Sequence, residues 1–232
     1  MFLPIIQWQR ARSALYYFSF LKRYWIKVAI KMHRLFKRAV YGVFIVAAVP
    51  LWLLYRLQSL LLGARKSFEG YSQLVSLFPG MPGNYLRWAF YRLTIDGLGE
   101  DTCICFGTTL VDPSIRIGKG VYIGPFCNLG LCTIEDDVLL GTGVHIISGF
   151  TQHNYSDLSI AIRDQKGSLR NVCVGRDTWI GNGAIVGNDV GTKCVIGAAS
   201  LVVHEIPPYS VAAGNPARII RDRRDISCQH EE

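Results

Sequence analysis

Apolar residues return every six positions over the second half of this 232-residue chain. Counted from Cys105, the first place of each six is apolar, and a glycine usually follows it. These first places are Val111, Ile117, Ile123, Leu129, Leu140, Ile146, Val174, Ile180 and Ile196, with a slip of one residue before Leu140. A period of six indicates one short strand and one turn repeated, so that three sixes close a triangular coil. The pattern predicts a parallel β-helix over 105–206.

Two further features of the repeat support this interpretation. Small or β-branched side chains hold the fifth place, at Val121, Cys127, Val144, Thr178, Ala184 and Ser200. The glycines fit the corners of a coil, where the backbone turns sharply and can need a positive φ. An ordinary parallel sheet or sandwich is the alternative, but the phase persists for nearly a hundred residues.

The repeat is interrupted once and is flanked by less regular segments. Polar residues fill 148–171, and a long unpatterned stretch within a regular coil is usually functional. Before the coil, 78–83 is rich in Pro and Gly and is expected to be a hinge, and 84–93 is expected to be a short helix. We therefore divide the chain into a membrane-associated helical segment 1–76, a linker and collar helix 77–104, the coil 105–206 and an extension 207–232.

The front of the chain has a different pattern. Over 20–38 a basic stripe alternates with an aromatic and apolar stripe at helical spacing, which suits a helix lying among lipid headgroups, although a solvated surface helix has the same pattern. Residues 39–55 carry no charge and are interrupted only by Pro50. Seventeen residues is short for a membrane span. A cleaved signal peptide is not expected, because the apolar stretch starts late and no cleavage site follows it.

Charge separates the same two parts of the chain. Residues 1–68 contain twelve Lys and Arg and no acid, whereas the remainder has thirteen basic and seventeen acidic residues, so the net charges are +12 and −4. The apolar content of the basic part favours a membrane partner over nucleic acid. The odd count of seven cysteines, with Cys127 and Cys194 at inward places, indicates reduced thiols in a domain that faces the cytosol.

The most specific segments are Asp177-Thr178-Trp179-Ile180-Gly181, Ala213-Gly214-Asn215-Pro216-Ala217-Arg218 and a histidine-containing loop before them. With these segments, 107–224 resembles the hexapeptide-repeat acyltransferases, the group of maltose, galactoside and xenobiotic O-acetyltransferases. The resemblance implies a mainly β fold, a left-handed parallel β-helix, here preceded by membrane-associated helices. It also implies a homotrimer that holds acetyl-CoA, or another acyl-CoA, between neighbouring coils, and it implies no metal.

The resemblance assigns roles to particular residues. His153, in the ejected loop, is the expected general base, and an imidazole suits that role because it titrates near neutral pH. His145 lies on a coil, where a structural role is expected, and Asp157 either orients His153 or only solvates the loop. Asn128 is expected to line the acceptor site or to form an asparagine ladder. The expected CoA-binding residues are Trp179, Gly181, Lys193, Gly197, Ala198 and Arg218.

The basic, apolar front departs from the soluble sugar acetyltransferases. We therefore expect an O-acetyltransferase that acts on a membrane-linked sugar, glycolipid or polysaccharide precursor. The alternative is an N-acetyltransferase of an amino sugar or nucleotide sugar, which needs no membrane anchor. A metal hydratase is disfavoured, because His145, His153 and His204 lack the spacing for a shared site, and a scaffold would not need the histidine loop. Because acetyl-CoA is cytosolic, the catalytic domain should face the cytoplasm, with 39–55 entering and leaving one leaflet around Pro50.

Overall fold

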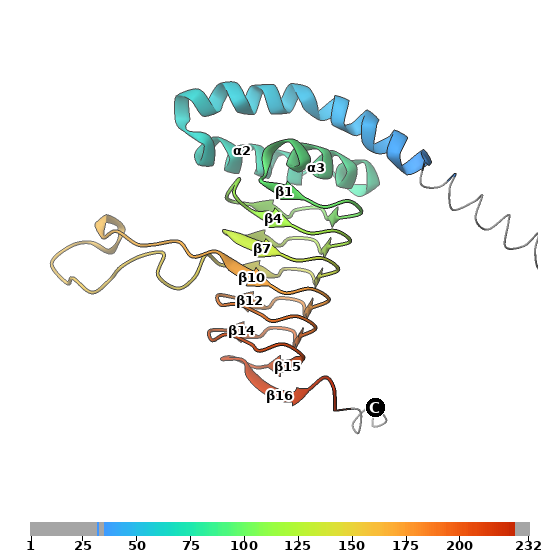
Figure 1. The fold of residues 1–232 in the computed structure, drawn as a ribbon. Helices are drawn as coiled ribbons and strands as arrows, with labels where there is room; N and C mark the ends of the chain where they lie inside the picture. Colours follow the sequence, from blue (N-terminus) through green and yellow to red (C-terminus); the bar gives the residue numbers. More distant parts are fainter. Residues whose placement is uncertain (1–31, 33–34, 226–232) are drawn as a thin grey trace, which may run out of the picture. The chain divides into compact units, whose positions relative to one another are not determined.

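The structure is a computed structural model, and it describes residue 32 and residues 35–225. Most of the predicted amphipathic helix over 20–38, and the end of the extension 207–232, lie outside the described residues. The chain divides into two compact units, Met1–Phe44 and Ile45–Glu232. The second unit contains the second part of a long helix, two collar helices and a parallel β-solenoid of about six turns (Figure 1).

The apolar segment forms one helix, Leu35–Leu62, of 28 residues, which is long and apolar enough to cross a membrane. The prediction that the chain turns back at Pro50 is wrong, because the helix continues through it. Proline removes one intrahelical hydrogen bond, but its fixed φ is compatible with a helix, and the apolar pattern continues on both sides. The helix ends instead at Gly63, where φ is +83°.

Two helices follow and cap the first coil: α2, Ala64–Ser76, and α3, Gly80–Thr94. The ring of Tyr55, on the long helix, packs edge-on against Phe68 of α2 and Phe90 of α3 at centroid distances of 6.2 and 6.3 Å. The helix expected over 84–93 is present as α3, and it starts earlier than expected, at Gly80. Proline is accommodated at position 82 because the first N–H groups of a helix lack intrahelical partners.

The turns of the solenoid contribute short, mainly parallel strands to three sheets, which we call faces A, B and C. In the last turns face A has isolated bridges at Val190 and Ile206 in place of strands. Face A contains β1 Gly97–Leu98, β4 Arg116–Ile117, β7 Cys132–Ile134 and β10 Val172–Val174. Face B contains β2 Cys103–Ile104, β5 Tyr122–Ile123, β8 Leu139–Leu140, β11 Trp179–Ile180, β13 Val195–Ile196, β15 Ser210–Ala213 and β16 Arg218–Asp222. Face C contains β3 Thr109–Leu110, β6 Asn128–Leu129, β9 His145–Ile146, β12 Ile185–Val186 and β14 Leu201–Val202.

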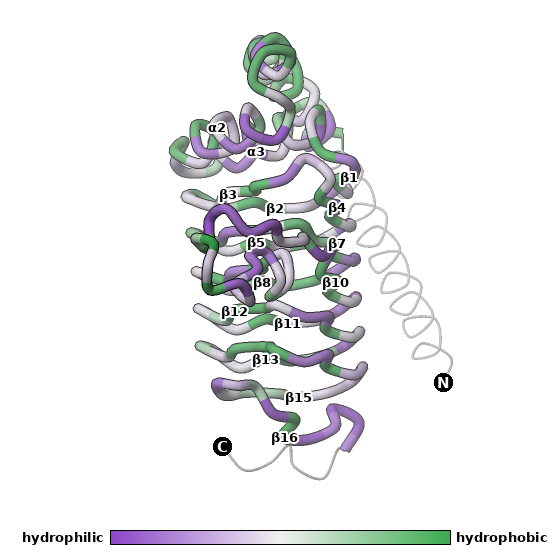
Figure 2. Tube along the Cα trace, turned by 90° about the vertical axis from the view of Figure 1, so that its left-hand side faces the viewer, coloured by the Kyte–Doolittle hydropathy of each residue, from purple (hydrophilic) through white to green (hydrophobic). Residues whose placement is uncertain are grey.

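The core is the stack of inward side chains that these strands provide. The fully buried members include Ile104, Leu110, Ile123, Leu129, Leu140, Val174 and Ile180. In Figure 2 hydrophobic segments recur from coil to coil, whereas the ejected loop and β16 are largely hydrophilic. The predicted repeat is thus confirmed from Ile117 onward. Before Ile117 the predicted phase is one residue late, because Ile104 and Leu110 point inward where Cys105 and Val111 were expected.

The glycines have two different structural roles. Gly107, Gly120, Gly143 and Gly183 lie at corners with φ between +66° and +75°, as expected. The glycines that follow the inward anchors lack a positive φ and face the next coil. A Cβ on Gly124 would lie 2.7 Å from the backbone carbonyl of Gly141, and one on Gly181 would lie 2.5 Å from the nitrogen of Ala198. At those places glycine permits the close stacking of successive coils.

The coil is longer than the predicted 105–206, since strands run from β1 to β15 and antiparallel β16 closes the last turn. Two late turns from face C to face A are shorter than six residues, since Val190 follows Val186 and Ile206 follows Val202 by four positions each. Val190, only four residues after Val186, takes the inward place on face A and bridges Val174 and Ile206. Between β9 and β10 the segment 148–171 leaves the coil as one extended excursion that contains a 3₁₀ turn, Ile162–Asp164 (Figure 1).

Candidate active site

The ejected loop begins with two arms that are paired by hydrogen bonds. The amide of Arg170 donates to the carbonyl of Ser148 at 2.9 Å, and the amide of Ser168 donates to the carbonyl of Thr151 at 2.7 Å. The Thr151 hydroxyl also donates to the Ser168 carbonyl at 3.2 Å. Beyond this pair Gly167 lies directly against Gln152, and a Cβ there would be 1.9 Å from the Gln152 carbonyl oxygen. The paired arms therefore extend to the residue before His153.

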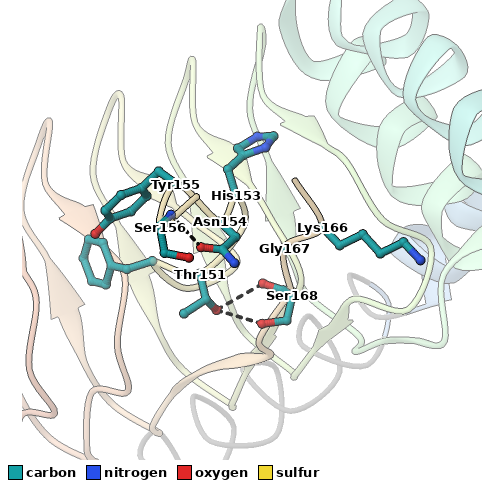
Figure 3. A pocket seen from close by; sticks show the side chains of 9 residues that line it. Thr151, His153, Asn154, Tyr155, Ser156, Lys166, Gly167 and Ser168 are labelled. Carbon is teal, nitrogen blue, oxygen red and sulfur yellow. Dashed lines mark hydrogen bonds between the residues drawn. The ribbon is translucent and has the colours of Figure 1, made fainter. Parts of the chain in front are cut away.

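His153 stands where the two arms separate, beside a cavity of about 550 Å³. The cavity is lined by Phe150, Thr151, His153, Asn154, Tyr155, Ser156, Lys166, Gly167 and Ser168, and eight of these are labelled in Figure 3. The imidazole is exposed and has no hydrogen-bond partner among the residues that the structure describes. Figure 3 shows it pointing away from the Thr151–Ser168 contact. An imidazole in this setting is free to exchange a proton with a bound molecule.

Asp157 is the residue that we considered as an orienting partner for His153. Its carboxylate accepts hydrogen bonds from the amide and the hydroxyl of Ser159, at 2.9 and 2.6 Å. These bonds to the charged form lower the pKa of Asp157. The Gln165 side chain then bridges the backbone of Asp157 and Ile160. Within the described residues Asp157 therefore stabilises the loop's own turn and makes no contact with His153.

Asn128 and His145 are direct neighbours on face C, where β6 pairs with β9. Both side chains point outward, and the Asn128 amide donates to the hydroxyl of Thr109 at 2.9 Å. Neither residue lines the cavity around His153. The described chain thus places Asn128 beside His145, which is exposed, and away from the cavity that contains His153.

The residues expected to bind CoA fall into two groups. Gly181, Gly197 and Ala198 stack at the corner between faces B and C. Arg218 lies next to this stack, because it pairs with Ala213. The Cβ of Ala213 would lie 2.7 Å from a Cβ added to Gly197. These four residues form a smooth backbone column with one exposed guanidinium at its end.

Lys193 lies at the opposite corner, between faces A and B, where its ammonium is 3.7 Å from the Asp177 carboxylate. Trp179 lies on face B between the two corners and is 54% exposed. It lines a second, smaller cavity of about 220 Å³ together with Asp137, Leu139, Asp177, Thr178, Val195 and Arg223. Lys193 is therefore separated from the glycine column by the width of face B.

Several cavity residues were not anticipated from the sequence. Phe150, Tyr155, Lys166 and Ser168 have no motif of their own, and their only signal was membership of the ejected segment. The two arms come together through backbone hydrogen bonds, which have no side-chain signature. Among the described residues no group of three or more His, Cys, Asp or Glu could hold a metal ion.

No family model matches the chain. It is 36% identical over 116 residues to the probable acetyltransferase Rv3034c of Mycobacterium tuberculosis, covering 48% of this chain and 38% of that protein. It is 32% identical over 130 residues to galactoside O-acetyltransferase of Escherichia coli, covering 50% and 61% respectively. The chain thus spans less than two thirds of the length of these relatives.

Solved structures share the fold over a larger part of the chain. A maltose O-acetyltransferase from Clostridium difficile 630 is 26% identical with a TM-score of 0.59, covering 70% of this chain and 88% of the other. The hexapeptide-repeat acetyltransferase VCA0836 of Vibrio cholerae is 24% identical with a TM-score of 0.61, covering 70% and 92%. A galactoside acetyltransferase in complex with coenzyme A is 24% identical with a TM-score of 0.56, covering 68% and 80%.

Proposed function

The β-helix of this chain belongs to the hexapeptide-repeat acetyltransferase family, and from this premise we propose that the protein is a CoA-dependent O-acyltransferase that transfers an acetyl group. The observation that carries the proposal is the position of His153. It ends a hydrogen-bonded loop stem, it lies beside a cavity of about 550 Å³, and its imidazole is exposed. A packing role does not account for a loop histidine that has no hydrogen-bond partner in the part of the chain that the structure describes.

The glycine column fits the acyl donor. Gly181, Gly197 and Ala198 present no side chain larger than a methyl group, so an extended pantetheine arm can lie along the backbone. Arg218 at the end of the column would meet phosphate oxygens, which guanidinium groups bind well. Lys193 fits this role less well, because it lies at the other corner of face B beside Asp177. Acetyl-CoA would supply the acetyl group as a thioester.

The chemical role of His153 follows from what a hydroxyl acceptor requires. A hydroxyl is a poor nucleophile until its proton is being removed, and the neutral imidazole would accept that proton as the oxygen attacks the thioester carbonyl. The imidazolium would then return the proton to the departing thiolate, which leaves the histidine ready for another turnover. General base catalysis of this kind contributes roughly 10²–10⁴-fold in rate.

We further propose that the working enzyme is a homotrimer. Within one chain, Asn128, the glycine column and the His153 cavity lie on different parts of the molecule, so one copy does not assemble the complete site. In a trimer the loop of one copy could meet the column and the Asn128 of its neighbour, where the amide could bind the acceptor hydroxyl or the developing oxyanion. Full activity in a monomer would contradict this arrangement.

The proposed acceptor is a hydroxyl of a membrane-linked sugar, glycolipid or polysaccharide precursor. The observation that supports this choice is the apolar helix. Helix residues with exposed large side chains include Val46, Leu53, Leu54, Leu57, Leu60 and Leu61. Such a surface is stable in water only when it is covered, and lipid would cover it. Because acetyl-CoA is cytosolic, we place the catalytic domain on the cytoplasmic side.

The test is transfer of radiolabelled acetyl groups from acetyl-CoA to the lipid-extractable glycans of membranes that contain the protein. His153→Ala should lower transfer by about 10²-fold or more, and His145→Ala, the matched exposed histidine on face C, should lower it much less. The reverse ranking would assign the base to His145. Mild alkali should release the label as an ester; alkali-stable label would instead indicate transfer to an amino group.

A further inference from the structure

The first of the two shortened turns holds the root of the ejected loop. Gly187, Asn188 and Asp189, which we call the seat, connect β12 to Val190 in place of a full-length turn. The seat lies against both ends of the loop, at Phe150 on the outgoing arm and at Arg170 on the returning arm. The seat therefore contacts the loop where it leaves the coil and where it returns.

On the outgoing side the contact is one of shape. A Cβ on Gly187 would lie 2.4 Å from two ring carbons of Phe150 and 3.1 Å from the Cδ1 of Ile147. Only glycine leaves room for the Phe150 ring against the coil at this point. The preceding residue, Gly149, has a φ of +80°, which turns the chain away from β9.

On the returning side the contact is polar and uses both guanidinium Nη atoms. Arg170 donates through Nη1 to the Asn188 side-chain oxygen and through Nη2 to the Asp189 carboxylate at 2.6 Å. The other carboxylate oxygen of Asp189 accepts the amide of Cys173 at 2.9 Å. The Asn188 amide donates to the Val203 carbonyl at 3.3 Å. The two groups that hold Arg170 are therefore themselves fixed to neighbouring parts of the coil.

These contacts are transmitted to His153 through the paired arms. Arg170 is hydrogen-bonded to Ser148 through the backbone, the next pair along the arms is Ser168 with Thr151, and Gly167 packs on Gln152 immediately before the histidine. Because Arg170 holds the two arms where they leave the coil, it also fixes the direction in which they carry His153. Freeing Arg170 would let the arms pivot about Ser148 and Asn171.

We propose that Arg170, held by Asn188 and Asp189, is a positioning residue that sets the place of His153 for catalysis. This inference rests on the proposed role of His153 as the base. It differs from that role in what it predicts, because the Arg170 contacts should order the loop whether or not the loop is catalytic.

The experiment compares Arg170→Ala with Arg163→Ala in the full-length, membrane-bound protein. Arg163 is a matched control in the same loop, where it pairs with the adjacent Asp164 at 3.6 Å and is far more exposed than Arg170. Hydrogen exchange of the amides of 150–169 is measured first, since it needs no activity. Arg170→Ala should speed this exchange about tenfold and leave the coil strands unchanged, whereas Arg163→Ala should do neither.

Kinetics then test positioning. Arg170→Ala should lower kcat by about tenfold or more, because small displacements of a catalytic group are costly, and should change the KM for acetyl-CoA less than twofold. Exchanging the charges, as Arg170→Asp with Asp189→Arg, should recover part of the kcat lost in either single variant. Faster exchange with an unchanged kcat would overturn the role of Arg170 in positioning His153. Unchanged exchange would overturn the claim that the contacts of Arg170 with the seat order the loop. An active His153→Ala protein would refute the proposed base. The exchange result would still show whether Arg170 orders the loop.

Discussion

The cysteines show, at the scale of single residues, how position on the coil determines chemistry. Cys127 and Cys194 are buried at inward places, as expected, and burial raises the pKa of both thiols. Cys103 begins β2 and Cys105 follows its last residue, and their sulfur atoms are 3.9 Å apart. The hydrogen bond from Cys103 lowers the pKa of Cys105 to about 6. Cys173 is exposed as a residue, but partial desolvation of its thiol and the nearby Asp189 carboxylate raise its pKa.

We therefore expect Cys105 to be the most reactive thiol at pH 7 among the cysteines that the structure describes, ahead of the more exposed Cys173. The thiolate is the nucleophile, and a pKa of about 6 leaves roughly nine-tenths of Cys105 ionised at pH 7. Alkylation by iodoacetamide, followed by peptide mass spectrometry from pH 5 to 9, should give Cys105 a midpoint near pH 6. Cys103→Ser should move that midpoint, because it replaces the group that donates to Cys105. Faster labelling of Cys173 at pH 7 would contradict the assignment.

The sequence supplied candidate site residues, but it did not supply their hydrogen-bond partners. His153 and the glycine column come from the resemblance to the hexapeptide-repeat acyltransferases, and their roles stay predictions. The partners of Asp157 were not predictable, because its two bonds to Ser159 are local alternatives that compete with any bond to a histidine. Arg170 was missed for a related reason, since its acceptors Asn188 and Asp189 are 18 and 19 residues away in the chain.

At the scale of the elements, some glycines are required because there is no room for a side chain, and others because the backbone has a positive φ. Gly124 follows an inward anchor and packs on the next coil, and a Cβ there would lie 2.7 Å from the Gly141 carbonyl carbon and oxygen. Gly143 lies one coil later at a corner, with a φ of +68° and nothing within 4 Å of its added Cβ. The two positions are close in the fold, and they should tolerate different substitutions.

Gly143→Asn should cost less stability than Gly124→Ala. Asparagine adopts the left-handed region with little penalty, and Asp137, Asp177 and Lys193 already do so at other corners of this coil. At Gly124 the clash is with backbone, and overpacking of that kind costs about 1–3 kcal/mol or more. Thermal unfolding of the two variants beside the parent protein checks the order. A larger loss for Gly143→Asn would mean that coil stacking is looser than the structure indicates.

Element boundaries were predictable where the period was regular and failed where local geometry decided. The strands from Ile117 onward followed the six-residue count. The coils before Ile117 did not, because Ile117 lies seven positions after Leu110. A strict count of six from Cys105 reaches Ile117 correctly but places the two earlier anchors one residue late. Pro50 was expected to reverse the chain. A proline inside a helix removes one hydrogen bond and crowds the carbonyl four residues earlier, which can bend a helix without reversing it.

At the scale of the whole molecule, the long helix limits how the protein can meet a membrane. Within Ile45–Leu62 the buried side chains are Ala48 and Tyr55, and the Tyr55 ring contacts the collar at Phe68, Tyr71 and Phe90. The other sides carry exposed apolar residues, with Leu60 and Leu61 more than 80% exposed. A helix with one side held by the collar suits a position in the membrane plane, where the free side faces lipid.

We still expect both flanks of the helix to lie on one face of the membrane. The reason is now that the helix lies in the membrane plane, and not that the chain turns back at Pro50. Basic residues on both flanks, such as Lys37, Arg38, Arg56 and Arg65, favour the cytoplasmic side. Anionic lipid would add about 1 kcal/mol for each well-placed cation. Salt should therefore weaken membrane binding without abolishing it.

The corresponding experiment labels single cysteines with an impermeant maleimide in sealed inside-out and right-side-out vesicles. We choose Gln9, Lys66 and Gln229; the first and last lie outside the described residues, and Lys66 is exposed whereas its neighbour Ser67 is 2% exposed. Cys103, Cys105 and Cys173 are replaced by serine beforehand, because they are not buried, and so is Cys228, which lies outside the described residues and next to Gln229. All three sites should react from the cytoplasmic face only. If Gln9 reacted only from the opposite face, the helix would cross the bilayer once, and the collar contact at Tyr55 would have to open in the membrane.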